Sequence, residues 1–558
     1  MEDRFETFTI LISRINRSIR KIKNQEMADW GLKSIHVSCL HYLRSQGSLT
    51  AAELCERCEE DKAAVSRAID HLKSEGFIEA STNGAKPYKC PLVLTKKGEQ
   101  AGDAIAQKIA TVLREIDDSL TDEQRAAFYQ SLTTVSNRLG AIARSANHRP
   151  QERVIAMFFL KKAYCRVFQI GFRAVLPVLP YREPEIIRSC ADLGPVLKKE
   201  HARTVLVVTD RGIVENGLTA PLEAMLRDAG VNYAVYDKTQ PNPTVDQVEE
   251  ALELYHQRQC TAIIGFGGGS SIDCAKAVGA RVAYPNKPLS RMKGVLRVLK
   301  ATPPIIAIPT TAGTGSEVTL AAVITDGREH HKYAIMSFPL IPHYAVLDAR
   351  LTYTLPPHLT STTGMDALTH AVEAYIGRST TKQTRELALD ATKLIFENIQ
   401  RAYEHGDDHE ARENMLHAAY KAGIAFSMSY VGYVHAIAHS LGGQYGVPHG
   451  LANAVILPYV LEAYGEAAHK KLHQLGVAAG VCAAIDSDAE GAAKFIAAIK
   501  ELNASMNIPE KISGIKRDDI AHLAHTAERE ANPLYPVPKL MTEHELAALY
   551  EEIADWNE

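Results

Sequence analysis

The stretch TAIIGFGGGSSIDCAKAVGA, residues 261–280, most constrains how this chain can fold. Its first part is a short continuous apolar run, which is typical of a strand buried on both faces. The run leads directly into a glycine-rich turn and a helical segment. Two further apolar runs, at residues 204–210 and 231–238, precede it and alternate with helical patterns. This alternation predicts a parallel sheet with crossover helices.

The glycine-rich turn at Gly267, Gly268 and Gly269 has the chemistry of a phosphate site. Glycines let the backbone approach a ligand closely, and the next helix offers free N–H groups and the positive end of its dipole. The turn follows the third strand, and G-x-G-x-x-G is absent from the first strand-to-helix turn, so the ordinary dinucleotide fingerprint is missing. A merely tight connection is the alternative interpretation.

A second polar loop follows another buried strand, in PPIIAIPTTAGTGSEVT at residues 303–319. Hydroxyl and small side chains crowd this stretch. Open α/β sheets hold their ligands at the carboxyl ends of strands. We therefore prefer a ligand site to a plain surface loop here.

After about residue 350 the pattern becomes almost wholly helical, and it contains a carboxylate with several histidines. Asp366 and His370 are four residues apart on one helix face, as are His435 and His439 on another, and His449 lies in the loop GVPHG. With 22 histidines, chance pairs are expected. The apolar surroundings favour a metal site over a chance cluster, because burying an unpaired Asp costs free energy and a bound cation removes that cost. A carboxylate with imidazoles suits Zn²⁺ or Fe²⁺.

Residues from about Met157 to Glu558 resemble the iron-containing (group III) alcohol dehydrogenases. The motifs that carry the resemblance are GGGSSIDCAK, PTTAGTGSEVT, GMDALTHAVEAY and HAIAHSLGGQYGVPHGLANAVILP. The resemblance implies a dehydroquinate-synthase-like fold. An α/β NAD-binding domain is expected at residues 157–348 and an all-helical metal-binding domain at residues 349–558. Glycerol dehydrogenases and dehydroquinate synthase, which share the fold, match these motifs less well.

The resemblance also implies roles for individual residues. The metal ligands would be Asp366, His370, His435 and His449, and the catalytic His439 would stand beside the metal without binding it. The pyrophosphate of the cofactor would be held by Gly267, Gly268, Gly269, Ser270 and Asp273. The rest of the cofactor would be lined by Asn242, Thr310, Thr311, Thr314, Thr319 and Lys332.

Asp210 ends the first strand of the nucleotide region. A carboxylate there can accept hydrogen bonds from the adenosine ribose and repel a 2′-phosphate, so NAD is favoured over NADP. The expected activity is hydride transfer between a small alcohol or aldehyde and NAD(H), with the metal as Lewis acid. The presence of all four ligands favours a ferrous site over an empty one, and ligand type leaves Zn²⁺ open.

Residues 1–150 follow a different plan. TAAELCERC and DKAAVSRAIDHLKSEG are expected to form two helices joined by a turn, and Thr50 with Glu53 has the spacing of a capping box. FIEA and YKCPLVLT, with Asn83–Gly84 between them, predict a hairpin. This order is that of an α+β winged helix-turn-helix domain, which places its second helix in the DNA major groove.

This first region resembles the MarR-type regulators over roughly residues 5–146, most sharply in LTAAELCERCEEDKAAVSRAIDHLKSEGFI and LVLTKKGE. The resemblance implies DNA contacts from the recognition helix and the wing, through Lys62, Ser66, Arg67, Lys86 and Lys89. The wing lacks the Asp-x-Arg element usual in that family. Residues 1–150 hold 22 Lys and Arg against 20 Asp and Glu, so phosphate attraction needs a local patch. A dimerisation module that no longer binds DNA is the alternative.

Cys55 and Cys58 form a C-x-x-C on a helix. We interpret them as core residues, since a spacing of three places both on one face, although a redox or metal switch has the same pattern.

The whole chain has 558 residues, 46% of them hydrophobic, and a net charge of −4, which indicates several globular domains without an overall basic footprint. No apolar run reaches the roughly 18 residues of a membrane span, and the charged, amphipathic N-terminus lacks the plan of a signal peptide. Nine scattered cysteines indicate a reducing cytoplasm.

Paired winged helices imply a homodimer or a higher homo-oligomer. Two functions remain open: a dehydrogenase with a DNA-binding regulatory domain, and a transcriptional regulator that uses the dehydrogenase module to sense NADH, metal or aldehyde.

Overall fold

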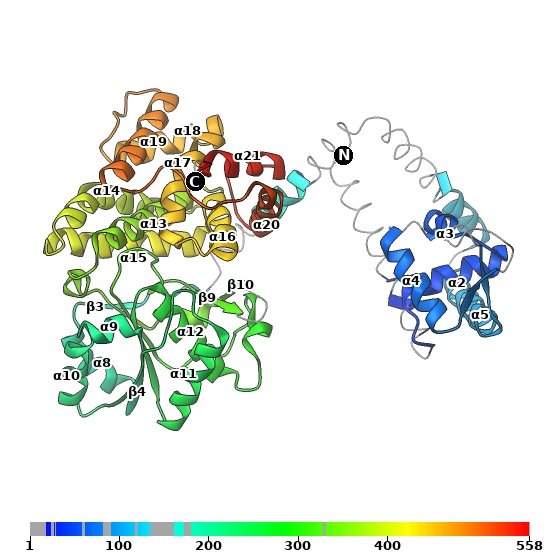
Figure 1. Ribbon diagram of the computed structural model, residues 1–558, viewed down its shortest axis with the longest axis horizontal. Coiled ribbons are helices and arrows are strands. Elements are labelled where there is room, and N and C mark those ends of the chain that lie inside the picture. Colours follow the sequence, from blue (N-terminus) through cyan, green and yellow to red (C-terminus); the bar gives the residue numbers. More distant parts are fainter. Residues whose placement is uncertain are drawn as a thin grey trace. The chain divides into compact units, whose positions relative to one another are not determined.

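The computed structural model describes residues 18–19, 21–23, 27, 30–58, 62–81, 91–117, 121–131, 133–134, 161–171, 180–326 and 331–556. The chain divides into two compact units, Met1–Arg153 and Val154–Glu558 (Figure 1), and each has a hydrophobic core of its own. In these described stretches we find no helix long and apolar enough to cross a membrane.

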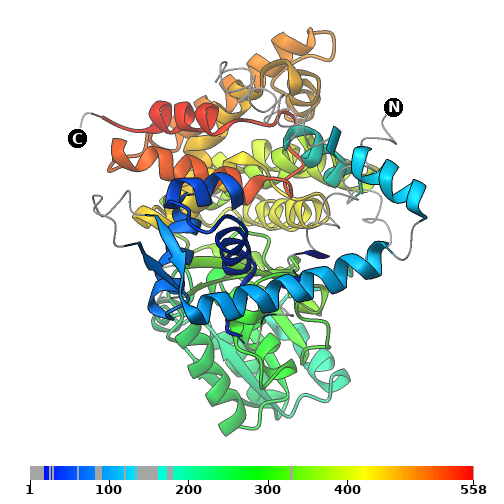
Figure 2. The same ribbon diagram turned by 90° about the vertical axis from the view of Figure 1, so that its right-hand side faces the viewer.

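The first unit has the predicted winged helix-turn-helix order. Its elements are α2 (Ser34–Gln46), α3 (Ala51–Cys58), α4 (Lys62–Ser74), β1 (Ile78–Ala80), β2 (Leu92–Leu94) and α5 (Lys96–Asp117). Strands β1 and β2 pair antiparallel, with Ile78 opposite Leu94. Leu40, Leu54 and Leu72 each have no exposed surface, so α2, α3 and α4 share one core. The long helix α5 is the blue rod of Figure 2. The predicted turn at Asn83–Gly84 lies outside the described residues.

The start of α3 follows the predicted capping box. The Thr50 N–H donates to Glu53 Oε2 at 2.7 Å, and the Glu53 N–H donates to Thr50 Oγ1 at 3.3 Å. These bonds satisfy N–H groups that have no partner inside the helix. Cys55 and Cys58 near the other end are half-buried against the core, and Cys58 Sγ lies 3.8 Å from Cys39 Sγ.

The second unit begins with a six-stranded sheet in the order β3-β11-β8-β6-β4-β5. Every neighbouring pair in it is parallel, as predicted. The strands are β3 (Glu185–Ile187), β4 (Thr204–Val208), β5 (Asn232–Tyr236), β6 (Ala262–Gly267), β8 (Ile305–Pro309) and β11 (Tyr344–Val346). The chain goes from β4 to β5 on one side and then returns to β6 on the other side of β4. The strand order therefore reverses between β4 and β6, where sheets of this kind bind ligands.

Both faces of the sheet are covered, which explains the continuous apolar runs. Val205 and Val207 pack with helices α8 (Leu193–Lys199) and α10 (Ala220–Asp228). Leu206 and Val208 pack on the opposite face with α11 (Val245–Gln257) and α12 (Gly269–Ala283). A small sheet of β7 (Gly294–Val295), β10 (His331–Met336) and β9 (Ala321–Asp326) adds to the second face, and the sequence did not predict it.

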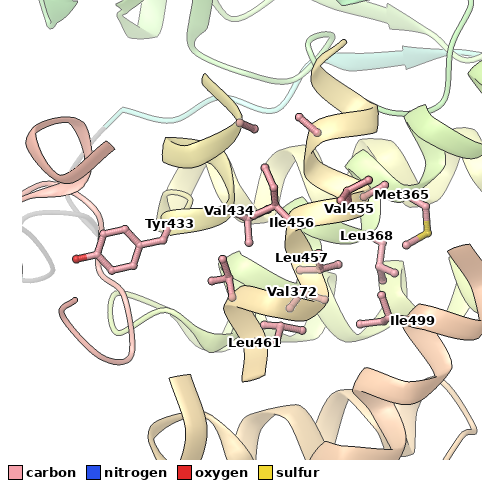
Figure 3. Packing of buried hydrophobic residues seen from close by; sticks show 14 of the residues in the cluster. Met365, Leu368, Val372, Tyr433, Val434, Val455, Ile456, Leu457, Leu461 and Ile499 are labelled. Atoms are coloured by element: carbon pink, nitrogen blue, oxygen red, sulfur yellow. The ribbon is translucent and has the colours of Figure 1, made fainter. Parts of the chain in front are cut away.

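The rest of the unit is helical, as expected, and lies beside the sheet part (Figure 1). Its α-helices are α13 (Pro357–Ile376), α14 (Lys382–Glu404), α15 (His409–Ser429), α16 (Tyr433–Tyr445), α17 (His449–Tyr464), α18 (His469–Ala478), α19 (Asp488–Ser505), α20 (Ile520–Ala531) and α21 (Glu543–Ile553). Figure 3 shows Leu368 from α13, Val434 from α16 and Ile456 from α17 meeting in its core. This packing positions α13, α16 and α17, which carry the predicted metal ligands.

The capping box yields a test of local stability. Thr50→Ala removes one acceptor at the start of α3 and is expected to cost about 1 kcal/mol. Hydrogen exchange of α3 amides, Leu54 among them, should accelerate accordingly. Thr542→Ala removes the equivalent cap of α21 in the other unit and serves as control. Equal exchange rates for α3 in the Thr50→Ala and Thr542→Ala variants would contradict the assigned cap.

Candidate functional site

The reversal of strand order brings two predicted residues together. Asp210 follows β4 and caps α9 (Arg211–Glu215), where its Oδ1 accepts from the Ile213 N–H at 3.0 Å. Gly267 ends β6 with a φ of 141°, which favours glycine. A Cβ at Gly267 would lie 3.5 Å from Asp210 Oδ2. The predicted ribose acceptor and the glycine-rich turn are therefore neighbours at the carboxyl end of the sheet.

The glycine-rich turn packs closely on the loop that follows β8. The Thr310 N–H donates to the Gly267 carbonyl at 3.0 Å. A Cβ on Gly269 would lie 2.8 Å from the Thr314 side chain, and one on Gly268 would meet Thr311 at 3.6 Å. Only a residue without a side chain fits this approach at Gly269. The two predicted cofactor loops thus form one polar surface.

Three further cofactor candidates meet at the start of α12. The Asn242 N–H donates to Ser270 Oγ at 3.3 Å, and Lys332 Nζ donates to Asn242 Oδ1 at 2.7 Å. Asn242 has a φ of 60°, an uncommon conformation for a residue with a side chain. Burial lowers the pKa of Lys332, and the carboxylates of Asp273, Glu530 and Asp366 oppose that shift. The Lys332 ammonium group therefore interacts electrostatically with a carboxylate of the sheet part and with carboxylates of the helical part.

Asp273 is engaged by the protein itself. One carboxylate oxygen accepts from Ser316 Oγ at 2.6 Å and the other from the Val323 N–H at 3.0 Å. These bonds tie α12 to the loop after β8 and to β9. A direct cofactor contact from Asp273 stays a prediction.

Lys276, one turn beyond Asp273, was not among the residues predicted from the sequence. Its side chain has no exposed surface, and its Nζ donates to Ser316 Oγ, to Thr319 Oγ1 and to two backbone carbonyls. Burial lowers its pKa to about 8, and burial raises the pKa of nearby Glu317 to about 7. Thr319 Oγ1 thus accepts a hydrogen bond from Lys276, and its contact with the cofactor stays a prediction. A lysine inside an apolar helix pattern was the signal that could have revealed this anchor.

Three of the four predicted metal ligands converge. Asp366 Oδ1 lies 3.6 Å from His449 Nε2 and 3.9 Å from His435 Nε2, and ligand atoms of all three residues lie within 4.8 Å of one another. The Asp366 side chain is 2% exposed. Gly450 makes this possible, because a Cβ there would lie 2.5 Å from the Thr362 carbonyl of α13.

His370, the fourth predicted ligand, is not part of this group of three. It is buried, and its ring stacks on Phe426 at 4.1 Å and on His435 at 4.6 Å between centroids. Its Nδ1 is buried without a hydrogen-bond partner in the described part of the chain. The ring is therefore adjacent to the cluster and has an unused nitrogen.

Two residues that the sequence analysis did not single out complete the cluster. His435 Nδ1 lies 2.6 Å from Glu373 Oε2, and a ring that carries its proton on Nδ1 has its lone pair on Nε2. Asn453 Nδ2 donates to Asp366 Oδ1 at 2.6 Å and also lies 3.1 Å from His449 Nε2. Glu373 follows His370 by one helical turn, and Asn453 follows His449 likewise. Their position one helical turn after a predicted ligand could have revealed both residues from the sequence, because polar partners commonly support metal ligands.

The protonation states suit a cation. Burial lowers the pKa of His449 to about 3 and that of His435 well below its usual range, so both rings are neutral. Burial raises the pKa of Glu373 to about 8, although the N–H groups of Gly432, Val434 and His435 oppose the shift. Asn453 Oδ1 is buried without a hydrogen-bond partner among the described residues. Neutral imidazoles, a buried carboxylate and two orphaned buried atoms fit a divalent metal ion.

His439 lies at the more open side of this cluster. Its ring stacks on His449 with 5.2 Å between centroids, and its Nδ1 lies 2.6 Å from Glu530 Oε1. The His439 side chain is 28% exposed. The loop after β8 also reaches this region, since a Cβ on Gly313 would lie 2.6 Å from Thr363 of α13. The cofactor loops and the metal cluster therefore border the same place.

In the first unit, Ser66 and Arg67 are exposed on α4. The side chain of Lys62, and the whole of Lys86 and Lys89, lie outside the described residues.

Comparison with known proteins agrees with these features. Residues 187–349 match the family model for iron-containing alcohol dehydrogenase, and residues 360–554 match the C-terminal model of the same family. Residues 30–86 match the MarR family.

Individual relatives extend this match. The chain is 38% identical to alcohol dehydrogenase 4 of Saccharomyces cerevisiae (strain YJM789), over 64% of this chain and 93% of that protein. It is 38% identical to an NAD-dependent methanol dehydrogenase of Bacillus methanolicus, over 60% of this chain and 88% of that protein. A crystal structure of 1,3-propanediol oxidoreductase superposes with a TM-score of 0.64 at 35% identity, covering 67% of this chain and 99% of the other. This chain belongs to the iron-containing alcohol dehydrogenases and carries a MarR-family domain at its N-terminus.

Proposed function

We propose that this chain is a metal-dependent alcohol dehydrogenase and aldehyde reductase that uses NAD(H) and short-chain substrates. The convergence of Asp366, His435 and His449 beside the two cofactor loops is the observation that carries the proposal. His370 is the fourth ligand in this proposal, and its orphaned Nδ1 supports that role. Iron is the proposed metal, in keeping with the family, and Zn²⁺ fits the same ligand types.

Several contacts support NAD as the cofactor. Gly267, Gly268, Gly269 and Ser270 offer the pyrophosphate a helix N-terminus. Asp210 stands next to that turn, where its charge favours a free ribose hydroxyl over a 2′-phosphate. Lys332 and Asn242, already bonded to each other, would hold the part of the cofactor nearest the helical cluster. The methanol dehydrogenase relative is likewise named NAD-dependent.

A bound divalent ion would supply Lewis acidity toward an alcohol or aldehyde oxygen, and NAD(H) would accept or donate hydride. The protein's own part is mainly geometric. Glu373 holds the His435 ring so that its Nε2 faces Asp366 and His449. The Asp366 side chain is buried, so bulk water does not reach its carboxylate. His439, whose side chain is 28% exposed, would exchange the proton of the reacting oxygen with water.

NADH oxidation tests the activity directly. Anaerobically purified, Fe²⁺-loaded protein is expected to reduce propanal and similar short aldehydes, and removal of the metal should abolish turnover. Asp366→Ala leaves the imidazoles without their carboxylate and should lower bound iron and kcat together by at least about a hundredfold. Lys382→Ala, on the exposed surface of α14, is the matched control. Full turnover in the metal-free protein or in Asp366→Ala would overturn the proposal.

Glu373 allows a finer prediction. Glu373→Gln keeps the shape of the side chain but replaces the carboxyl group that lies against His435 Nδ1 with an amide. Metal affinity is expected to fall about 10- to 100-fold, as for other carboxylates behind a ligating histidine. Competition with a chelator, read as bound Fe²⁺ or Zn²⁺, measures this without any turnover. Unchanged metal affinity would show that His435 needs no such support.

We also propose that the winged-helix unit binds DNA as part of a homodimer or a higher homo-oligomer, in the cytoplasm, where NAD(H) and DNA are both available. The exposure of Ser66 and Arg67 on the recognition helix α4 supports this second role. The enzyme would then also regulate transcription.

Binding to DNA is tested on the full-length chain. Selection from random duplex DNA should enrich a palindromic operator, and Arg67→Ala should weaken its binding about tenfold or more. Lys382→Ala on the other unit should bind like the unchanged protein. If no sequence is enriched and Arg67→Ala equals the control, the winged helix is a structural module without an operator.

A further inference from the structure

His439 has a partner that its sequence neighbourhood does not reveal. Glu530 lies 91 residues further along the chain, on α20, and its Oε1 is 2.6 Å from His439 Nδ1. The same oxygen accepts from the Tyr535 hydroxyl at 2.8 Å. Helix α20 packs against α16, so this contact follows from the way the helices are arranged.

The pair determines which nitrogen of the ring carries the proton. An ionised carboxylate only accepts hydrogen bonds, so a neutral His439 that bonds to Glu530 has its proton on Nδ1. The lone pair is then on Nε2. Among the described residues, none forms a hydrogen bond with that nitrogen. The ring meanwhile stacks on His449 and lies 5.9 Å from the ring of His435, between centroids.

Tyr535 is itself held firmly. It is 8% exposed, and its carbonyl accepts from Gln169 Nε2 at 2.8 Å. Gln169 also donates to the Pro533 carbonyl at 3.2 Å, while Arg166 donates to the carbonyls of Val537 and Pro538. The helix at residues 161–171 therefore anchors the loop that carries Tyr535.

A second histidine–carboxylate pair provides a contrast. His525 Nδ1 lies 2.8 Å from Glu543 Oε1, but these side chains are 50% and 51% exposed, and no tyrosine of the described part of the chain donates to Glu543. The His439–Glu530 pair is 28% and 31% exposed and borders the metal cluster. The geometry of the two pairs is similar, whereas their surroundings differ.

We propose that Glu530, supported by Tyr535, is a positioning residue that holds His439 in the tautomer with the proton on Nδ1 and Nε2 free. This inference deepens the proposed dehydrogenase function and rests on it. When an alcohol is oxidised, its O–H proton passes to Nε2 while the electron pair stays on oxygen, and hydride leaves the carbon for NAD⁺. In the reverse direction Nε2–H returns the proton. The Glu530 charge also stabilises the imidazolium that forms, as in other histidine–carboxylate pairs.

Kinetics of four variants test the positioning role. Glu530→Gln keeps size and shape but removes the charge and can bond to Nδ1 in either orientation. We expect kcat for propanal reduction to fall about 10- to 100-fold, in the range for acid–base groups. The KM for propanal, the Kd for NADH and the bound iron should stay within about twofold. Tyr535→Phe should give a smaller fall in kcat, and Glu530→Asp should recover part of the loss. Glu543→Gln is the matched control at the exposed pair.

The tautomer is measured independently of turnover. In full-length, Zn²⁺-loaded protein labelled with ¹⁵N-histidine, subtraction of the His439→Gln spectrum identifies the two ring nitrogens of His439. A protonated Nδ1 in the unchanged protein, and a mixture of tautomers in Glu530→Ala, are expected. A protonated Nε2 in the unchanged protein, or a kcat of Glu530→Gln equal to that of Glu543→Gln, overturns the inference. Absent turnover with the expected tautomer refutes only the proposed activity.

Discussion

The burial of Asp366 among apolar helices is the constraint on which the rest of the catalytic unit depends. A lone carboxylate at that depth would cost several kcal/mol. Asn453 Nδ2 and the Nε2 atoms of His435 and His449 surround it, and each comes from α16 or α17. The helices must therefore meet at one point, and the apolar core around Leu368, Val434 and Ile456 keeps them there (Figure 3).

A second buried charge organises the sheet side. Lys276 Nζ joins α12 to the loop after β8 and to the start of β9 through bonds to side chains and carbonyls. These bonds hold the glycine-rich turn against the loop that follows β8. The two predicted cofactor loops therefore keep a fixed position relative to each other. Lys332 then stands between the two parts, because charges of both affect its pKa. The two predicted cofactor loops and the group of Asp366, His435 and His449 thus border the same place.

The N-terminal unit has a separate core and a separate chemistry. Leu40, Leu54 and Leu72 belong to that core, which consists of residues of the N-terminal unit. Its charge is close to balanced, and Ser66 and Arg67 are exposed on α4. One chain therefore combines an iron-containing alcohol dehydrogenase with a MarR-family domain.

The sequence by itself determined the winged helix, the parallel sheet and the helical region, because these depend on local periodicity, caps and glycine-rich turns. It also predicted Asp366, His435, His439 and His449 as site residues, from their spacing and apolar surroundings along the chain. Only the tertiary structure decided which partners these residues have. Glu530 and Lys276 make contacts across the fold, the His370 ring stacks on His435, and Asp273 bonds to Ser316 and Val323. Such contacts depend on how helices pack on one another and on the sheet, which a pattern along the chain does not encode.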